Sequence, residues 1–156
     1  LYTAGYSIVV VSNQSGVARG HFGVQALEHV RERLVEMLAD VGVPLLGFYY
    51  CPHHPAGRVP RFSLACSCRK PEPGLFFRAA AEHHIDLSNS LLIGDILDDV
   101  EAGHRAGCRS ILLFNGHETE WVLTGRRMPE MIAGDLTEAA SYVISNTSEG
   151  AAVASL

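Results

Sequence analysis

The stretch Ser90-Leu91-Leu92-Ile93-Gly94-Asp95-Ile96-Leu97-Asp98-Asp99 passes from an apolar run to an acidic helix start within a few residues. Residues 90–93 predict a short buried strand, because a parallel strand that is covered on both faces is apolar throughout. A helix follows over about residues 98–106, and Gly107 ends it. The apolar residues 109–114 then predict a second strand. Strand, helix and strand in this order are typical of a parallel sheet.

The same alternation extends over the rest of the chain. Two more apolar runs predict strands at residues 7–11 and 45–50. Further helices are predicted at residues 24–41, 74–84 and 135–144. The first of these helices has an apolar face at helical spacing, formed by Leu27, Val30, Leu34, Leu38 and Val41. We therefore expect an α/β fold, a Rossmann-like parallel sheet with helices on both faces.

The composition is that of an ordinary globular domain. The 156 residues are 47% hydrophobic and 19% charged, which suffices for one core. The formal net charge of −5 argues against nucleic acid as a partner, because a basic surface is needed to neutralise phosphates. No apolar run is long enough for a membrane span and no secretory signal pattern occurs, so a cytoplasmic protein is expected. The expected partner is a small molecule, and a monomer is expected.

The two ends of the printed sequence carry separate expectations. The chain begins with Leu1, and residues 1–6 have the pattern of a helix end that is capped by Gly5. We expect an N-terminally truncated reading of a longer protein. A single domain is expected at residues 1–145, and the small, polar residues 146–156 are expected to form a disordered tail.

The segment after the second predicted strand combines metal ligands with basic residues. It contains Cys51-Pro52-His53-His54 and, after a loop, Cys66-Ser67-Cys68-Arg69-Lys70-Pro71. Thiolates and an imidazole in two close pairs match a tetrahedral zinc site, and the predicted ligands are Cys51, His53, Cys66 and Cys68. The alternative is a set of buried free thiols or a disulfide. His54 is expected beside the ligands or the substrate, and Cys108 is expected in the core.

Polar residues follow three of the predicted strands, at the position where parallel α/β sheets bind their ligands. Ser12-Asn13-Gln14 follows the first strand, Cys51 follows the second, and Asp95 follows the third. We expect these groups to meet at one edge of the sheet. Their convergence indicates a site more strongly than any single motif does.

Asp95 and Asp99 are the candidate magnesium residues. Asp95 lies in the turn after a strand, and Asp99 lies in the first turn of the following helix. Carboxylates placed in this way can hold Mg²⁺ directly or orient its water ligands. The alternative is the ordinary preference of acidic residues for a helix N-terminus, which is the role expected for Asp98.

Two polar groups are candidates for holding a phosphoryl group. Past the first strand, hydroxyl groups and backbone amides are offered by Ser12, Asn13, Gln14 and Ser15. The alternative for these residues is an ordinary polar turn. Lys70 offers a point charge and Arg69 a planar fork for an anionic or hydroxylated substrate. The alternative for this pair is a solvated basic surface.

Together these motifs resemble one family. Val9-Val10-Val11-Ser12-Asn13-Gln14-Ser15-Gly16-Val17-Ala18-Arg19-Gly20, Tyr50-Cys51-Pro52-His53-His54-Pro55, Cys66-Ser67-Cys68-Arg69-Lys70-Pro71 and Gly94-Asp95 with Asp99 are similar to the D-glycero-D-manno-heptose 1,7-bisphosphate phosphatases of the haloacid-dehalogenase (HAD) superfamily. The resemblance extends to about Leu113. It implies a HAD-like fold without a cap domain, a zinc-bound loop and a magnesium ion. It also implies hydrolysis of a phosphomonoester, the C7 phosphate, through an aspartyl-phosphate.

The resemblance implies a role for each candidate residue as well. Ser12 and Lys70 would stabilise the phosphoryl group, and Asp95 would bind Mg²⁺ with the support of Asp99. The substrate would be bound by Asn13, Gln14, Ser15 and Arg69. A structural Zn²⁺ would be held by Cys51, His53, Cys66 and Cys68, and it would shape the substrate loop.

Two departures from the family pattern limit these implications. The family's first motif, Asp-x-Asp-Gly-Thr, supplies the nucleophile and the general acid/base, and no aspartate precedes Asp40 in this sequence. The chain as printed is therefore expected to be inactive. Ile96 stands where the heptose enzymes carry a lysine that touches the substrate, so histidinol-phosphate phosphatase, a sister activity, is the alternative. An inactive, zinc-stabilised module that binds phosphorylated ligands is the alternative of a different class.

Overall fold

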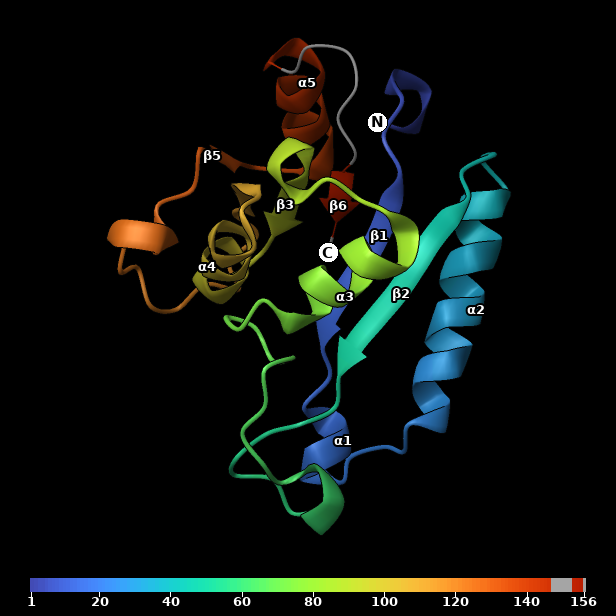
Figure 1. Ribbon diagram of the computed structural model, residues 1–156, viewed down its shortest axis with the longest axis vertical. Coiled ribbons are helices and arrows are strands. Elements are labelled where there is room, and N and C mark those ends of the chain that lie inside the picture. Colours follow the sequence, from blue (N-terminus) through green and yellow to red (C-terminus); the bar gives the residue numbers. More distant parts are fainter. Residues whose placement is uncertain (147–152, 156) are drawn as a thin grey trace.

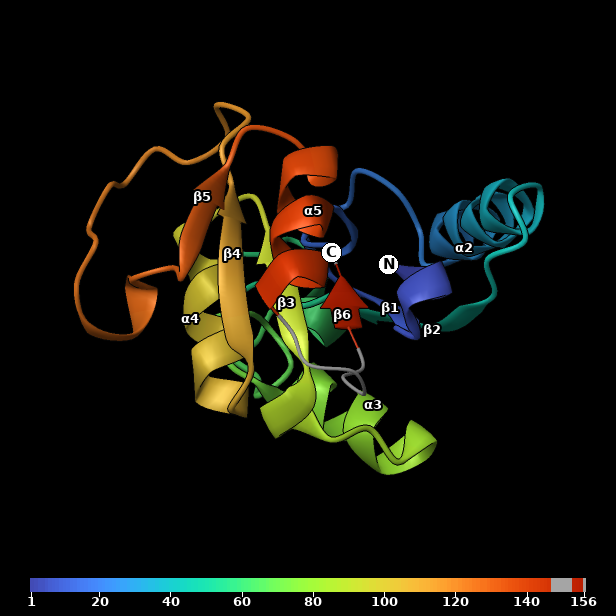
Figure 2. The same ribbon diagram turned by 90° about the horizontal axis from the view of Figure 1, so that it is seen from above.

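The computed structural model describes residues 1–146 and 153–155, and within them every strand pair is parallel. One hydrogen-bonded group is the pair β1–β2 (Figure 1), and the other has the order β5-β4-β3-β6 (Figure 2). The strands are β1 (Ile8–Asn13), β2 (Leu45–Cys51), β3 (Leu91–Gly94), β4 (Arg109–Leu113), β5 (Met131–Ala133) and β6 (Val153–Ser155). The predicted parallel α/β architecture is confirmed.

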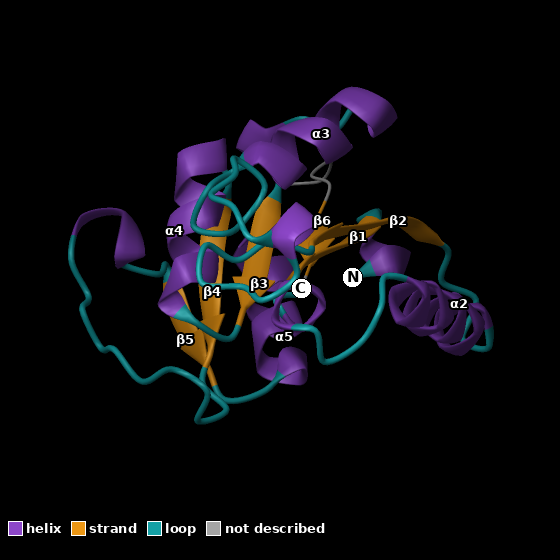
Figure 3. Ribbon diagram, turned by 90° about the horizontal axis from the view of Figure 1, so that it is seen from below, coloured by secondary structure: helices purple, strands orange, loops and turns teal. Residues whose placement is uncertain are grey.

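Helices cover both faces of these strands. α3 and α4 lie on one face, whereas α5 and α2 lie on the other (Figure 3). The α-helices are α1 (Gly16–Arg19), α2 (Gln25–Ala39), α3 (Gly74–His83), α4 (Leu97–Ala106) and α5 (Leu136–Asn146). Short 3-10 helices are η1 (Tyr2–Ala4), η2 (Pro60–Phe62), η3 (Leu87–Asn89) and η4 (Gly125–Arg127). None of the helices in the described residues is both long and apolar enough to cross a membrane.

Alternation of side chains along β3 divides the core in two. Leu92 packs on the α3 side, in a cluster with Phe76. Leu91 and Ile93 pack on the α5 side, in a cluster with Val143. Because successive side chains of a strand point to opposite faces, a strand between two helical layers must be apolar at every position. This accounts for the uninterrupted apolar run that marked the strand in the sequence.

The space between β1 and β3 is the least regular part of the sheet. Within the described residues these two strands belong to separate hydrogen-bonded groups. β6 pairs with β3 and lies between β3 and β1 (Figure 2). Residues 147–152 and 156 lie outside the described residues, so the expected disorder of the tail stays a prediction there, while Asn146 ends α5.

The apolar face predicted for residues 24–41 is only partly buried. Leu27 is buried, whereas Val30 is 46% exposed. The helix ends at Ala39, so Val41, which is 71% exposed, lies beyond it. α2 packs against β2, which is an edge strand, and not over the centre of the sheet. A helix at an edge meets too little surface to cover its whole apolar face, so the periodicity predicted the helix correctly but overstated its burial.

Two glycines end helical turns as the sequence indicated. Gly5 and Gly107 both have φ of +90°, the left-handed region that glycine enters without steric cost. The expected helix end at residues 1–6 is the short η1, where the Gly5 amide donates to the Tyr2 carbonyl and the Tyr6 amide donates to the Leu1 carbonyl. Gly107 ends α4 and turns the chain directly into β4.

Candidate active site and metal centre

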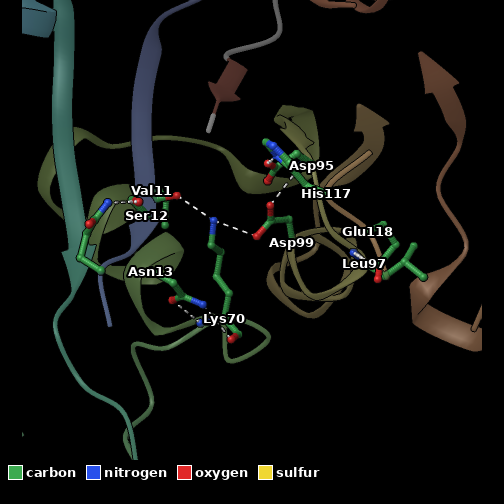
Figure 4. Close-up of polar contacts among 10 residues, drawn as sticks. Val11, Ser12, Asn13, Lys70, Asp95, Leu97, Asp99, His117 and Glu118 are labelled. Carbon is green, nitrogen blue, oxygen red and sulfur yellow. Dashed lines mark hydrogen bonds and ion pairs between the residues drawn. The ribbon is translucent and has the colours of Figure 1, made fainter. Parts of the chain in front are cut away.

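The carboxyl ends of β1, β3 and β4 surround one cavity. Its volume is about 320 Å³, and its walls are formed by Val11, Ser12, Lys70, Asp95, Asp99, Leu113 and Asn115. The parallel sheet therefore brings together four of the predicted site residues that lie far apart in the sequence: Ser12, Lys70, Asp95 and Asp99 (Figure 4). Their catalytic roles stay predictions.

Lys70 is the central cation of this cavity. Its Nζ lies 2.9 Å from Asp99 Oδ1 and donates a hydrogen bond of 2.8 Å to the carbonyl of Val11. The Lys70 and Asp99 side chains are only 7% and 6% exposed. A charged group that is so little exposed to solvent must be stabilised by protein groups. The Asp99 carboxylate and the Val11 carbonyl do this for Lys70, and they hold its ammonium group in one place.

Asp99 connects the lysine to the β3–α4 turn. Its second oxygen, Oδ2, accepts a hydrogen bond of 3.2 Å from the backbone amide of Asp95. Both Asp99 oxygens are thus engaged by protein groups, which suits an orienting role better than direct metal ligation. Gly94 permits this approach, because a Cβ at that position would lie 2.3 Å from the Asp99 Cβ.

The remaining predicted substrate residues lie beside the cavity and support its walls. The Asn13 side chain makes two hydrogen bonds with the backbone of Lys70, donating to its carbonyl at 3.1 Å and accepting from its amide at 3.0 Å. Gln14 Nε2 donates to Ser12 Oγ at 2.8 Å. Ser15 stands at the start of α1, where its carbonyl accepts the amide of Arg19.

Asp95 carries the most solvent-exposed carboxylate of the cavity. Its Oδ2 accepts a hydrogen bond of 2.5 Å from His117 Nδ1. Burial raises the pKa of the Asp95 carboxyl, but the hydrogen bond from His117 and the charge of Lys70 outweigh burial and bring the pKa below its usual value. The carboxylate is therefore ionised at neutral pH, as a ligand for a divalent cation must be.

Sequence reasoning missed Asn115 and His117. Both follow β4, so the rule that selected Ser12 and Asp95 at the ends of other strands would have selected them too. Residues 115–118 form no recognisable motif, so their place after a strand is the signal that points to them.

The predicted zinc ligands form one compact cluster. The three sulfur–sulfur distances among Cys51, Cys66 and Cys68 are 3.2, 3.3 and 3.5 Å. His53 Nδ1 lies 3.3 Å from Cys68 Sγ and 3.7 Å from Cys51 Sγ. Bonds of about 2.3 Å from Zn²⁺ to sulfur place tetrahedral sulfurs about 3.8 Å apart, so a small expansion would seat the ion. The cluster could hold zinc, and the disulfide alternative is wrong because all four cysteines are free.

The zinc cluster and the cavity share a segment of chain. Asn13 at the end of β1 is in register with Cys51 at the end of β2. Cys68 lies two residues before Lys70, and Arg69 between them donates to the His53 carbonyl at 3.5 Å. Fixing the cluster therefore fixes the backbone that carries Lys70 into the cavity.

Comparison with known families agrees with this arrangement. A HAD-hydrolase-like family model matches residues 67–139, which include Lys70, Asp95 and Asp99. The matched part thus contains all of the residues that line the cavity except Val11 and Ser12, and it includes the helices α3 and α4.

Curated relatives are similar over a longer part of the chain. The D-glycero-beta-D-manno-heptose-1,7-bisphosphate 7-phosphatase of Escherichia coli O6:H1 is 48% identical over 102 residues, which is 65% of this chain and 54% of that protein. The D-glycero-alpha-D-manno-heptose-1,7-bisphosphate 7-phosphatase of Photorhabdus laumondii is 40% identical over 116 residues, which is 74% of this chain and 63% of that protein. The matched regions thus span a little over half of these relatives' own length.

Solved structures share the fold over nearly the whole chain. The D,D-heptose 1,7-bisphosphate phosphatase of B. bronchiseptica, solved with magnesium and phosphate, has a TM-score of 0.74 and 29% identity, covering 94% of this chain and 79% of that one. A putative HAD-like phosphatase of Mesorhizobium loti also has a TM-score of 0.74, with 33% identity, covering 92% and 66%. This chain is a homologue of the heptose-1,7-bisphosphate 7-phosphatases and shares the HAD-like fold of these structures.

Proposed function

We propose that this chain forms the phosphoryl-binding body of a magnesium-dependent phosphomonoester hydrolase. The proposed substrate is D-glycero-D-manno-heptose 1,7-bisphosphate, with loss of the C7 phosphate. The observation that carries the proposal is the buried Lys70 ammonium, which is held by Asp99 at 2.9 Å in the wall of a cavity shared with Ser12 and Asp95. The names of the curated relatives support the choice of substrate.

Each residue of the cavity has a chemical task in this proposal. Lys70 places a fixed positive charge beside the phosphoryl oxygens, and the Ser12 hydroxyl donates a hydrogen bond to them. Asp95 would hold Mg²⁺, while Asp99 orients both Asp95 and Lys70. The carboxylate donors fit Mg²⁺, a hard cation that takes oxygen ligands. When bound, Mg²⁺ would offset negative charge on the phosphate.

The nucleophile is the part of the reaction for which this sequence offers no candidate. The family resemblance implies an aspartate that becomes phosphorylated, and no aspartate precedes Asp40. Asp40 directly follows α2, remote from the strand ends that form the cavity. We therefore propose that the 156-residue chain binds the substrate without hydrolysing it.

We further propose one single domain over residues 1–145 that acts as a monomer. The four free cysteines support a reducing compartment such as the cytoplasm.

A binding panel tests this function. Heptose 1,7-bisphosphate, histidinol phosphate and inorganic phosphate would each be titrated into the chain by calorimetry, with and without Mg²⁺. We expect Mg²⁺-dependent binding that is tightest for the bisphosphate. Preferential binding of histidinol phosphate would favour the alternative that Ile96 leaves open, because a substrate-contacting lysine is missing there.

Variants tie the binding to the cavity. Ser12→Ala and Lys70→Met are expected to weaken phosphate binding at least tenfold, because each removes a group aimed at the phosphoryl oxygens. Arg33→Met, at an exposed position on α2, is the matched control and should leave binding unchanged. Equal binding by Ser12→Ala and the wild type would refute the proposed site. Release of phosphate by the 156-residue chain would refute the predicted lack of turnover.

A further inference from the structure

The segment after β4 is fastened to the N-terminus of α4 by a single carboxylate. Glu118 Oε2 accepts a hydrogen bond from the amide of Leu97, the first residue of α4. Glu118 Oε1 accepts the amides of Thr119 and Glu120 at 2.7 and 2.6 Å. The first amides of a helix lack partners within it and favour negative charge, so this contact gives the segment a defined attachment point.

Further contacts hold the same segment to the first and the last turn of α4. Arg127 Nη2 lies 3.4 Å from Asp98 Oδ1, and the carbonyl of Arg126 lies 2.7 Å from His104 Nδ1. Leu123 packs against an apolar cluster that includes Val100, in the middle of α4. Residues 115–127 therefore form a strap with attachments at both ends of α4 and in the middle.

The strap delivers one side chain to the cavity. His117 directly precedes Glu118, and its Nδ1 donates to Asp95 Oδ2 at 2.5 Å (Figure 4). Within the described residues, Asp95 Oδ1 has no hydrogen-bond partner, while the Asp95 backbone amide is held by Asp99. The carboxylate is thus fixed at one oxygen and available at the other. An ion pair between exposed side chains alone would be weak, but this one is placed by a fastened segment.

We propose that His117 is a positioning residue for Asp95. It holds Oδ2 so that Oδ1 faces the cavity for a divalent cation, and Glu118 in turn positions His117. This inference rests on the proposed magnesium site. His117 is not assigned as a ligand, because Mg²⁺ prefers oxygen donors and the Nδ1 proton is already donated to Asp95. Ligating carboxylates are commonly oriented by such hydrogen bonds, and loss of the partner typically lowers metal affinity about 10–100-fold.

Calorimetric titration of Mg²⁺ alone into the full chain tests the proposal. His117→Ala is expected to weaken Mg²⁺ binding by about 10-fold or more. His117→Asn should restore much of the affinity, because its amide nitrogen can donate from nearly the place of Nδ1. His29→Ala, at an exposed histidine of α2, is the matched control and should bind as the wild type does.

A double variant separates positioning from a general effect on structure. Glu118→Ala should weaken Mg²⁺ binding in the same direction, and the His117→Ala/Glu118→Ala chain should bind no worse than His117→Ala alone, because Glu118 acts through His117. If the losses of Mg²⁺ affinity in the two single variants added up in the double variant, Glu118 would not act through His117, and that part of the proposal would be overturned. Mg²⁺ binding by His117→Ala that equals or exceeds the wild type would overturn the inference while leaving the magnesium site intact. Absence of Mg²⁺ binding by the wild type would overturn both.

Discussion

Lys70 Nζ and Asp99 Oδ1 lie 2.9 Å apart, and each side chain is almost completely buried. The lysine follows the zinc-ligand loop, whereas the aspartate lies in the first turn of α4. The pair therefore joins the two halves of the candidate site across the edge of the sheet. Its energetic importance lies less in the attraction itself than in the cost of leaving either charge alone in the interior.

Replacement of Asp99 by asparagine should destabilise the protein strongly. The variant leaves the Lys70 ammonium buried without a counter-charge, which typically costs about 3–5 kcal/mol. Urea unfolding followed by circular dichroism would measure the loss. Asp98→Asn is the matched control, because Asp98 faces Arg127 at 3.4 Å on a more exposed surface and should cost less than about 1 kcal/mol.

The double variant Lys70→Met/Asp99→Leu sharpens this prediction. Removal of both charges eliminates the unpaired ion, so the double variant should be more stable than Asp99→Asn alone. If Asp99→Asn unfolded at the same urea concentration as the wild type, the buried pair would have no structural importance.

Gly94→Ala should disrupt the same pair from the backbone side. A Cβ at Gly94 would lie 2.3 Å from the Asp99 Cβ and 2.6 Å from its Oδ2, which is closer than such atoms approach. Asp99 must then move away from Lys70, so we expect a loss of more than about 2 kcal/mol in the free energy of unfolding. The measurement is again urea unfolding.

Gly134→Ala is the control for this substitution. Gly134 is exposed, and its added Cβ would meet only the end of the flexible Glu138 side chain at 3.3 Å. Its effect should be small. Similar stability losses for the two alanine variants would show that the Gly94–Asp99 contact has no special role.

The sheet and the strand-end residues could be predicted because both follow from local sequence. Apolar runs of strand length fix which segments form β1, β3 and β4, and the parallel order places the residues after them at one edge. The zinc ligands were found for a similar reason, since cysteine and histidine at close spacing leave few other interpretations. In both cases the chemistry lies within a few residues of the element that positions it.

Features that depend on distant segments could not be predicted in this way. β5 has only three residues, too few for a periodic pattern, and it forms because it adds to the edge of β4. The exposure of Val30 depends on where α2 lies on the sheet, which the periodicity of the helix does not encode. The contact between His117 and Asp95 joins residues on two different loops, and only the attachment of Glu118 to α4 brings them together.

Loss of one zinc ligand should release the metal and loosen the loop that carries Lys70. Cys66→Ser is expected to abolish stoichiometric zinc, which elemental analysis would measure as one ion per wild-type chain. Burial raises the pKa of the Cys51 thiol, so zinc binding must displace its proton and should weaken as the pH falls. Cys108→Ala is the control, because Cys108 is buried but is not one of the four residues that could hold the metal. Full zinc content in Cys66→Ser would contradict the assignment.

Glu130 links β4, β5 and α5, and its ionisation gives stability a defined pH dependence. Arg109 Nε donates to Glu130 Oε2 at 2.7 Å, and Tyr142 donates to Oε1 at 2.6 Å. The hydrogen bonds and charge of Arg109 lower the Glu130 pKa below its usual value of 4.5, against the opposing effect of burial. A carboxyl with a lowered pKa in the folded state stabilises above its unfolded pKa and loses that contribution as the pH falls through the folded value.

Glu130→Gln should therefore be less stable than the wild type at pH 7, by about 0.5–1 kcal/mol because the pair is partly exposed to solvent. The difference should persist down to about pH 4.5 and shrink at lower pH, since protonation removes the charge from the wild type as well. Urea unfolding of both proteins between pH 3 and pH 7 would measure it. Glu36→Gln, in the far more exposed pair with Arg33, should show no measurable difference over the same range. A stability difference for Glu130→Gln that stays constant or grows as the pH falls below 4.5 would refute the assigned role of its charge.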